Sequence, residues 1–236
     1  MSSNFYTTKI QLFTSYFDCN HNIKPTAIFN IFQDLACVHG ELIGVGFKEM
    51  LQKNLYWVLT RVKYDILTNP NVDQVVVLET WPCEKGRVDF DRDFLIKNEQ
   101  GEILIKGTSK WCVINATTRM LERPTLVNYT CECRNEKVYA DKFVKTEVCN
   151  QFEPANYEHI VSFSEIDHNQ HLNNVNYATY VTNTLKNITF NHLQINFISE
   201  CKLNDKISVC YIKNQNNEYV ISGYVNNTLK FTALAK

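Results

Sequence analysis

Residues 165–177, EIDHNQHLNNVNY, bring three chemically different polar side chains into one short stretch. Asp167, Asn169 and His171 alternate with one residue between each, and Asn173 and Asn174 follow directly before an apolar-periodic segment. A carboxylate, an amide and an imidazole in this spacing could bind a metal, form a polar turn that caps a helix, or belong to an active site.

A metal site fits the neighbouring residues poorly. A calcium-binding loop that begins at Asp167 requires glycine at its sixth position and glutamate at its twelfth, and these positions hold Leu172 and Ala178. His168 and His171 are three residues apart but lack the His-Glu-x-x-His pattern of zinc hydrolases. We therefore predict that the protein uses neither a metal nor another cofactor.

The other two interpretations both follow from the residue types. Aspartate and asparagine favour turns, and Asn173 or Asn174 would cap the following helix, predicted over 173–187. A helix start also presents amides and a partial charge of about +0.5, which can polarise a carbonyl and stabilise an oxyanion. Asp167, Asn169 and His171 would add a carboxylate, an orienting amide and a titratable imidazole. The residues of this stretch leave both interpretations open.

A second polar segment, INFISECKLNDKIS at 195–208, lies downstream. If it is a strand, alternation sorts its side chains onto two faces: Ile195, Phe197, Ser199 and Cys201 on one, and Asn196, Ile198, Glu200 and Lys202 on the other. Spacing alone predicts that Glu200 is a solvated carboxylate beside Lys202 and that Cys201 is a small core residue.

The polar turn occurs twice in the chain. The segment FDCNHNIKPTAIFNIF (17–32) aligns with IDHNQHLNNVNYATYV (166–181) at an offset of 149 residues, which places Asp18 on Asp167 and Asn20 on Asn169. The copies differ where the second has His171, because the first has Asn22 there. This asymmetry predicts one catalytic copy and one copy that shapes a pocket.

Each copy has the same predicted order of elements: a strand, the loop, a long helix and about four antiparallel strands. The expected strands are 5–14, 55–68, 73–81, 87–97 and 102–115 in the first copy, and 157–163, 191–201, 205–213, 217–225 and 228–235 in the second. A helix over 25–39 or 173–187 wrapped by an antiparallel sheet is an α+β hotdog module. We predict an N-terminal hotdog (1–124), a connector that packs on the body (125–155) and a C-terminal hotdog with the catalytic residues (156–236).

The bulk composition is that of a globular protein with no broad electrostatic field. The net charge is −1, so nothing indicates binding to nucleic acid or to an anionic membrane surface. No stretch approaches the roughly 18 apolar residues of a membrane span, and the first residues lack a signal-peptide pattern. The nine cysteines contain no Cys-x-x-Cys pair, which favours buried, reduced thiols and a cytoplasmic location.

The motif IDHNQHLNNVNY, with the pair EC at 200–201, resembles the plant and bacterial acyl-acyl carrier protein thioesterases. NHNIKPTAIFNIFQDLACVHGELIG, YWVLTRVKYDI and DFDRDFLIKNEQG resemble the same family, and the resemblance is weakest over 125–155. It implies a double-hotdog fold and hydrolysis of fatty acyl thioesters on carrier protein, with Asp167, Asn169, His171 and Glu200 at the catalytic positions. The family has also been read as using a cysteine nucleophile, here Cys201; we favour water activated by the carboxylate, with Cys201 at most accessory.

The resemblance also suggests where the substrate binds. It implies an acyl slot between the helix over 25–39 and its sheet, lined by Ala27, Ile28, Ile31, Phe32, Leu35, Trp57 and Leu59. Ordinary core packing explains these residues equally well. The acidic carrier protein would dock on local cations, for which the candidates are Lys85, Arg87, Arg92, Lys106 and Lys110.

Two other functions remain open on the same fold. One is an acyl-coenzyme A thioesterase, which shares the chemistry and differs in the carrier, and the other is a non-catalytic acyl-binding regulator. The Asp-Asn-His set of the second copy argues against the regulator. Because the fused repeat already supplies a pair of hotdogs, either a monomer or a homodimer is possible.

Overall fold

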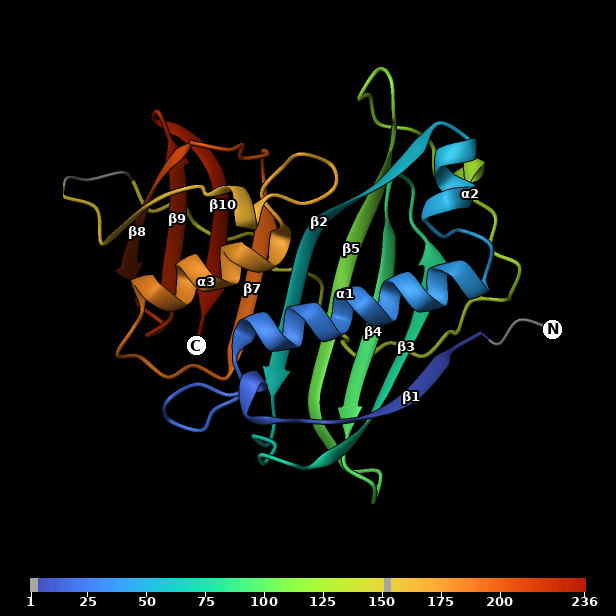
Figure 1. The fold of residues 1–236 in the computed structure, drawn as a ribbon, viewed down its shortest axis with the longest axis horizontal. Coiled ribbons are helices and arrows are strands. Elements are labelled where there is room, and N and C mark those ends of the chain that lie inside the picture. The colour runs from blue at the N-terminus through green and yellow to red at the C-terminus, as the bar shows by residue number, and fades with distance from the viewer. Residues whose placement is uncertain (1–3, 151–153) are drawn as a thin grey trace. The chain divides into compact units, whose positions relative to one another are not determined.

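The computed structural model describes residues 4–150 and 154–236. The chain forms two compact units, Met1–Lys142 and Phe143–Lys236. Each contains a sheet with one long helix across it (Figure 1). We describe each unit separately.

The first unit has five antiparallel strands in the order β1-β3-β4-β5-β2. Its elements are β1 (Tyr6–Gln11), the 3-10 turn η1 (Thr14–Tyr16), α1 (Pro25–Leu42), α2 (Phe47–Gln52), β2 (Leu55–Ile66), β3 (Val75–Lys85), β4 (Phe90–Lys97), β5 (Ile103–Asn115) and η2 (Pro124–Leu126). Helix α1 lies across the sheet and is longer than predicted at its C-terminal end.

The second unit repeats this arrangement with strands in the order β6-β8-β9-β10-β7, again antiparallel. Its elements are β6 (Tyr157–Ile160), η3 (Phe163–Glu165), α3 (Asn174–Thr184), β7 (His192–Phe197), β8 (Lys206–Lys213), β9 (Tyr219–Val225) and β10 (Thr228–Ala235). In chain order β1 to β5 correspond to β6 to β10, so the two sheets have the same topology. The predicted α+β double hotdog is confirmed.

Helix α1 forms because its sequence suits its first turn and buries one of its faces. Pro25 occupies the first turn, where its missing N–H costs nothing. Apolar residues at helical spacing then bury a face that includes Ile28, Phe32 and Leu35. The Phe32 ring stacks on Phe94 of β4 with centroids 4.3 Å apart, which fixes the helix against the centre of its sheet.

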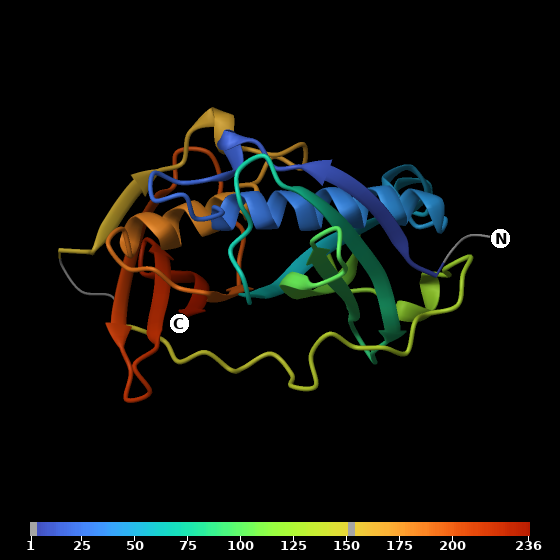
Figure 2. The same ribbon diagram turned by 90° about the horizontal axis from the view of Figure 1, so that it is seen from below.

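The segment after η2 forms no helix or strand in its described part, 127–150 and 154–156. Residues 151–153 of the predicted connector lie outside the described residues. Figure 2 shows the yellow-green part of this segment, within each unit, on the side of the sheet that is opposite that unit's long helix. In the first unit the Val138 amide donates to Asp93 at 2.9 Å, and in the second the Val144 amide donates to Gln194 at 3.1 Å. The expectation that this segment packs on the body is confirmed.

One strand boundary matters for the site. The strand predicted over 191–201 ends at Phe197, because the amides of Ile198 and Ser199 both donate to the carbonyl of Lys230, at 2.9 and 3.1 Å. A shift in the register between β9 and β10 lies at the same place, between Leu229 and Phe231. The predicted two-faced alternation is therefore wrong beyond Phe197, and the segment that carries the downstream carboxylate is a loop.

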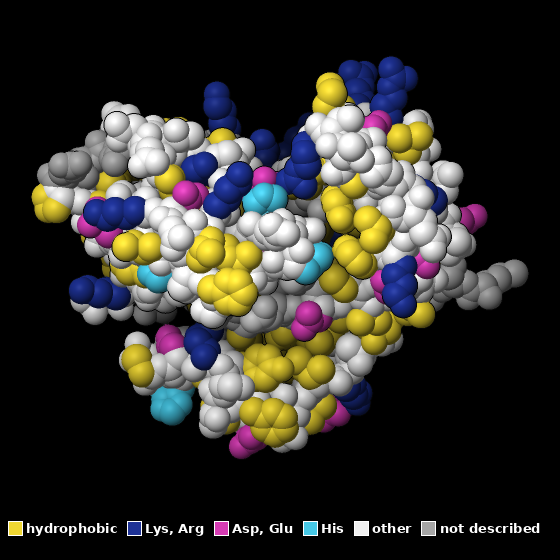
Figure 3. All heavy atoms as spheres, turned by 45° about the horizontal axis from the view of Figure 1, so that its top comes forward, with side chains coloured by type: hydrophobic (Ala, Val, Ile, Leu, Met, Phe, Trp, Pro, Cys, Tyr) yellow, Lys and Arg dark blue, Asp and Glu magenta, His cyan; other side chains and the backbone are white. Residues whose placement is uncertain are grey.

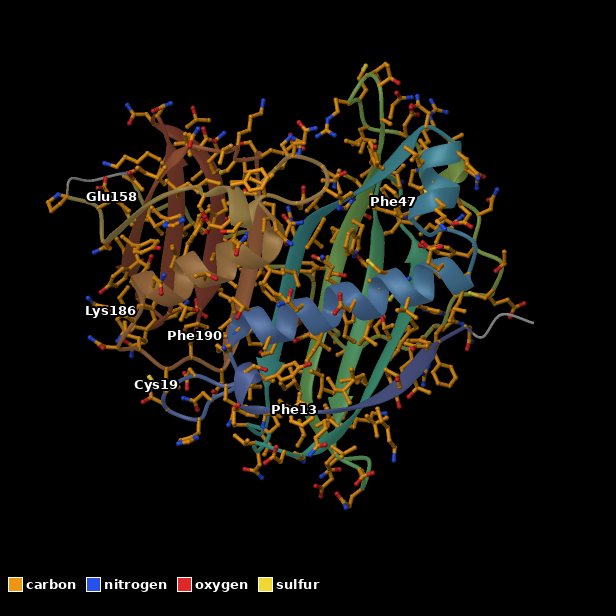
Figure 4. All side chains as sticks on the ribbon, viewed as in Figure 1. Phe13, Cys19, Phe47, Glu158, Lys186 and Phe190 are labelled. Atoms are coloured by element: carbon orange, nitrogen blue, oxygen red, sulfur yellow. The ribbon has the colours of Figure 1, made fainter. Side chains whose placement is uncertain are left out.

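The edge strand β6 of the second unit carries a charged pair. Glu158 on the edge strand β6 pairs with Lys206 at 2.9 Å, and such charges discourage pairing with another chain. Figure 4 labels Glu158 and the exposed Phe47 of α2, whose ring stacks on Tyr56.

Among the described residues, none of the helices combines the length and the apolar character that crossing a membrane requires.

Candidate active site

The polar turn of the second unit is organised around the carboxylate of Asp167. Its Oδ1 accepts hydrogen bonds from the amides of Asn169 at 2.8 Å and His171 at 3.3 Å. The Asp167 amide donates to the His171 carbonyl at 2.8 Å, and Gln170 adopts a positive φ of 66° to close the turn. The loop is therefore fixed by its own sequence, and the imidazole of His171 leaves it in a defined direction.

The first unit contains the same turn with Asn22 in the place of His171. Asp18 Oδ1 accepts from the amides of Asn20 at 2.8 Å and Asn22 at 2.9 Å, and His21 has a φ of 62°. The backbone conformation of the turn thus does not depend on a histidine at the position of His171. What distinguishes the second copy is the set of side chains that the turn presents.

In the second unit His171 meets the carboxylate of Glu200. Its Nε2 lies 2.9 Å from Glu200 Oε2, and their side chains are 20% and 45% exposed, so solvent reaches the pair. Because a carboxylate oxygen can only accept, Nε2 of His171 is the donor in this contact. The expectation that Glu200 is a solvated carboxylate beside Lys202 missed this contact.

Two hydrogen bonds hold the backbone at Glu200 and Cys201 in place. The Leu172 amide donates to the Cys201 carbonyl at 2.9 Å, which joins the residues directly after His171 and Glu200. Lys230 Nζ donates to the Glu200 carbonyl at 3.0 Å. Lys230, which sequence reasoning missed, thus supports the loop through both its side chain and its carbonyl.

The start of α3, Asn174, lies three residues after His171. Asn173 is the N-cap, and its side chain accepts from the Val175 amide at 3.1 Å, as predicted for one of the two asparagines. Its carbonyl accepts from the Asn176 amide at 2.9 Å. Since those two first-turn amides already donate to Asn173, the amide of Asn174 is the candidate donor to a substrate carbonyl.

Cys201 is placed as a core residue. Its side chain is 0% exposed, and burial raises the pKa of the thiol, an effect that a hydrogen bond with Tyr177 and the nearby Lys230 charge oppose. A thiol acts as a nucleophile in its ionised form. Burial and the raised pKa both argue against Cys201 in that role.

The structure also locates the other residues predicted for substrate binding. Ala27, Ile28, Ile31, Phe32 and Leu35 are buried on α1, whereas Trp57 and Leu59 on β2 are partly buried. Trp57 packs on the cluster that includes Met50 and Phe90 and donates from Nε1 to the Val45 carbonyl at 2.9 Å. These contacts are also those of a packed core, so an acyl slot here stays a prediction.

The proposed docking cations need one correction. Arg92 is buried, 8% exposed, and its guanidinium contacts His39 Nδ1 at 3.1 Å, so it is unavailable at the surface. Lys110 is held between Asp89 and Asp91, at 2.9 and 2.7 Å. Figure 3 shows lysine and arginine side chains spread over the displayed face among acidic and neutral ones.

Within the described residues, no group of three or more histidine, cysteine or carboxylate side chains gathers as a metal site requires. The site presents several groups that can take part in a reaction. These are a carboxylate and an imidazole in contact, an amide side chain on Asn169 and a helix start.

Known proteins resemble the chain in sequence over most of its length. It is 32% identical to a palmitoyl-acyl carrier protein thioesterase of Gossypium hirsutum over 65% of the chain and 40% of that protein. It is 30% identical to oleoyl-acyl carrier protein thioesterase 2 of Arabidopsis thaliana over 85% of the chain and 61% of that protein. The chain thus spans less than two thirds of the length of either relative.

Solved structures share its fold. An acyl-ACP thioesterase from Bacteroides thetaiotaomicron superposes with a TM-score of 0.87 at 19% identity, covering 98% of this chain and 97% of that one. The 12:0-ACP thioesterase of Umbellularia californica gives a TM-score of 0.85 at 20% identity, covering 100% and 98%. At these identities the likeness shows the fold.

The family itself is shown by two sequence models that match successive parts of the chain. The model of the acyl-ACP thioesterase N-terminal domain matches residues 3–125, and that of the C-terminal domain matches residues 149–230. Together they include both copies of the polar turn and the contact between His171 and Glu200. The chain belongs to the acyl-ACP thioesterase family.

Proposed function

We propose that the protein hydrolyses fatty acyl thioesters on acyl carrier protein to the free fatty acid and the carrier thiol. The observation that carries this proposal is the 2.9 Å contact between His171 and Glu200 beside the start of α3, in a chain of this family. Relatives named for palmitoyl and oleoyl carrier-protein substrates support the substrate class.

In the first step a water molecule attacks the thioester carbonyl carbon. His171 donates from Nε2 to one oxygen of Glu200, which leaves the other carboxylate oxygen to take a proton from the water. The carbonyl oxygen becomes an oxyanion beside the Asn174 amide, where the helix start favours negative charge. Asn169 orients the water or the carbonyl, and Asp167 keeps the loop in shape.

In the second step the tetrahedral intermediate collapses. The carbonyl re-forms, the C–S bond breaks, and the carrier leaves as a thiolate that takes the proton held by Glu200. A thiol with a pKa near 8.5 is a good leaving group, so little acid assistance is required. Asp167, Asn169, His171 and Glu200 are thus assigned catalytic or supporting roles, and Cys201 none.

The decisive experiment is an assay of free-acid release from a panel of acyl carrier protein substrates that differ in chain length. His171→Ala and Glu200→Ala should each lower kcat by about 10²–10⁴-fold, the range typical of general acid–base groups. His168→Ala is the matched control, because it removes an exposed histidine of the same turn. Near-normal turnover by both catalytic variants would refute the mechanism.

The same acyl chains on coenzyme A separate the remaining functions. Faster hydrolysis of the coenzyme A esters would identify an acyl-coenzyme A thioesterase. A thioester that binds without release of acid would identify an acyl-binding regulator.

A further inference from the structure

The carboxylate of Glu165, at the end of η3, lies at the centre of a polar network directly before the catalytic turn. Its Oε2 accepts from the amide and hydroxyl of Ser162, both at 2.8 Å, and contacts His159 Nε2 at 2.7 Å. Its Oε1 accepts from the Tyr180 hydroxyl of α3 at 2.9 Å. The carboxylate thus links β6, η3 and α3, and its side chain is 15% exposed.

The peptide group of Glu165 holds the opposite end of the turn. Its carbonyl accepts from the Asn173 amide at 2.9 Å and from the Asn176 side-chain amide at 3.1 Å. Asn173 is the N-cap of α3 and lies two residues after His171. The turn 166–173 is therefore closed at its base by one residue, and displacement of Glu165 would displace His171 and the helix start together.

The Glu165 carboxyl group remains charged although it is largely buried. Burial alone would raise the pKa of the Glu165 carboxyl, but the hydrogen bonds from Ser162, His159 and Tyr180 outweigh it and hold the pKa below its usual value. Hydrogen bonds to a charged acceptor are stronger than those between neutral groups. The carboxylate is thus a firm anchor at neutral pH.

The first unit provides an internal comparison at the same offset of 149 residues. There the backbone bond is retained, because the Lys24 amide donates to the Tyr16 carbonyl at 2.9 Å. Every polar member of the network is replaced, however. In place of His159, Ser162, Glu165, Asn176 and Tyr180 the first copy has Ile10, Phe13, Tyr16, Ala27 and Ile31.

A turn of this shape therefore does not require the network, yet the network occurs in the copy that carries the imidazole and the opposing carboxylate. We propose that Glu165 is a positioning residue, whose carboxylate fixes the catalytic turn so that His171 stays in hydrogen-bond contact with Glu200. This role rests on the proposed function, and Glu165 itself acts through His171 and the start of α3 without touching the substrate.

The test compares Glu165→Ala with Glu218→Ala. Glu218 in the same unit is a matched carboxylate: its side chain is 19% exposed, it bonds Lys236 at 3.1 Å, and the Asn214 side chain holds its pKa low. Both variants should lose thermal stability to a similar degree. Glu165→Ala should also lower kcat by about 10–100-fold with KM within about threefold, because small misplacements of a catalytic group are costly. Glu218→Ala should keep the wild-type kcat.

Rescue by the conservative variant separates positioning from general loss of structure. Glu165→Gln keeps an acceptor for Ser162 and His159, so its kcat should exceed that of Glu165→Ala by about tenfold or more. If Glu165→Ala does not fold, Tyr180→Phe removes a single hydrogen bond, and Tyr224→Phe removes a buried hydroxyl elsewhere in the unit. Tyr180→Phe should then lower kcat about threefold to tenfold, and Tyr224→Phe should not.

A second readout does not depend on turnover. The imidazole nitrogen signals of His171, assigned in NMR spectra by comparison with His171→Ala, should shift in Glu165→Ala and stay unchanged in Glu218→Ala. Unchanged signals, a kcat within twofold of wild type, or equal rates for the alanine and glutamine variants would each overturn the positioning role. If the wild type releases no acid, the proposed function fails, and the NMR comparison alone decides whether Glu165 positions His171.

Discussion

Replacement of Cys201 by alanine distinguishes the two ways in which this site could open a thioester. A nucleophilic thiolate would make Cys201 indispensable, whereas water activated by Glu200 would leave it without a chemical role. Cys201 is fully buried and contacts Tyr177 rather than solvent. We therefore expect Cys201→Ala to release fatty acid at a rate within about threefold of the wild type.

The small effect expected of Cys201→Ala follows from the ionisation state of the Cys201 thiol. An ordinary cysteine with a pKa near 8.5 is about 3% thiolate at pH 7. Burial raises the pKa of Cys201, so the thiolate fraction of Cys201 is smaller than that of an ordinary cysteine. Removal of one buried sulfur should cost about 1 kcal/mol of folding free energy. Glu200→Gln, in contrast, should lose about 10²–10⁴ in kcat, or roughly 3–5 kcal/mol of transition-state stabilisation.

The assay measures acid release by both variants, with thermal unfolding to confirm that each is folded. Cys210→Ala is the control, because Cys210 is an equally buried thiol on β8 of the same unit. A folded Cys201→Ala variant without activity, beside an active Cys210→Ala variant, would refute the reasoning. An acyl group found on Cys201 by mass spectrometry after rapid quenching would do the same.

Three further outcomes are expected. Asp167→Ala and Asp18→Ala each remove a carboxylate that accepts from two turn amides. Each variant should therefore lose about 1 kcal/mol of unfolding free energy, measured by urea denaturation. Only Asp167→Ala should also slow acid release, by tenfold or more. Gly107→Ala would place a Cβ 2.2 Å from the Phe32 ring, and this overpacking should cost about 1–3 kcal/mol of stability by the same measurement. Because the pKa of Glu165 is lowered on folding, its contribution is present at neutral pH and is lost as pH falls below about 4.3. The difference in unfolding free energy between wild type and Glu165→Gln should therefore shrink from pH 7 to pH 4.

The fold could be predicted because its signals are local and occur twice. Helical spacing after each polar turn and alternating strands after each helix define the same order of elements in both halves. The end of β7 could not be predicted in this way. It is set by the carbonyl of Lys230, which accepts from Ile198 and Ser199 across about thirty residues of chain, and the apolar pattern around these positions continues past the true end.

The site was predictable to different degrees. Asp167, Asn169 and His171 stand out because one short turn presents them all. Spacing alone predicted Glu200 as a solvated carboxylate, and its side chain is indeed 45% exposed, but spacing gave no sign of its contact with His171. The network of Glu165 depends on contacts between β6, η3 and α3, which no local pattern encodes. One signal was nevertheless present in the sequence: comparing the two copies position by position shows polar residues replacing apolar ones at these sites.

That comparison explains why the opening stretch supports two interpretations. The bonds around Asp18 repeat those around Asp167 almost unchanged, so the turn and its link to the helix are structural features that both copies share, with or without an imidazole at the position of His171. A polar turn before a helix is therefore weak evidence for catalysis. The chemical proposal depends instead on what the second copy adds to that turn: His171 in contact with Glu200, and a charged residue behind the turn at Glu165 where the first copy has Tyr16. The substitution Asn22→His, which places an imidazole in the first copy, should consequently create no second active site, because that copy has Tyr16 in place of Glu165.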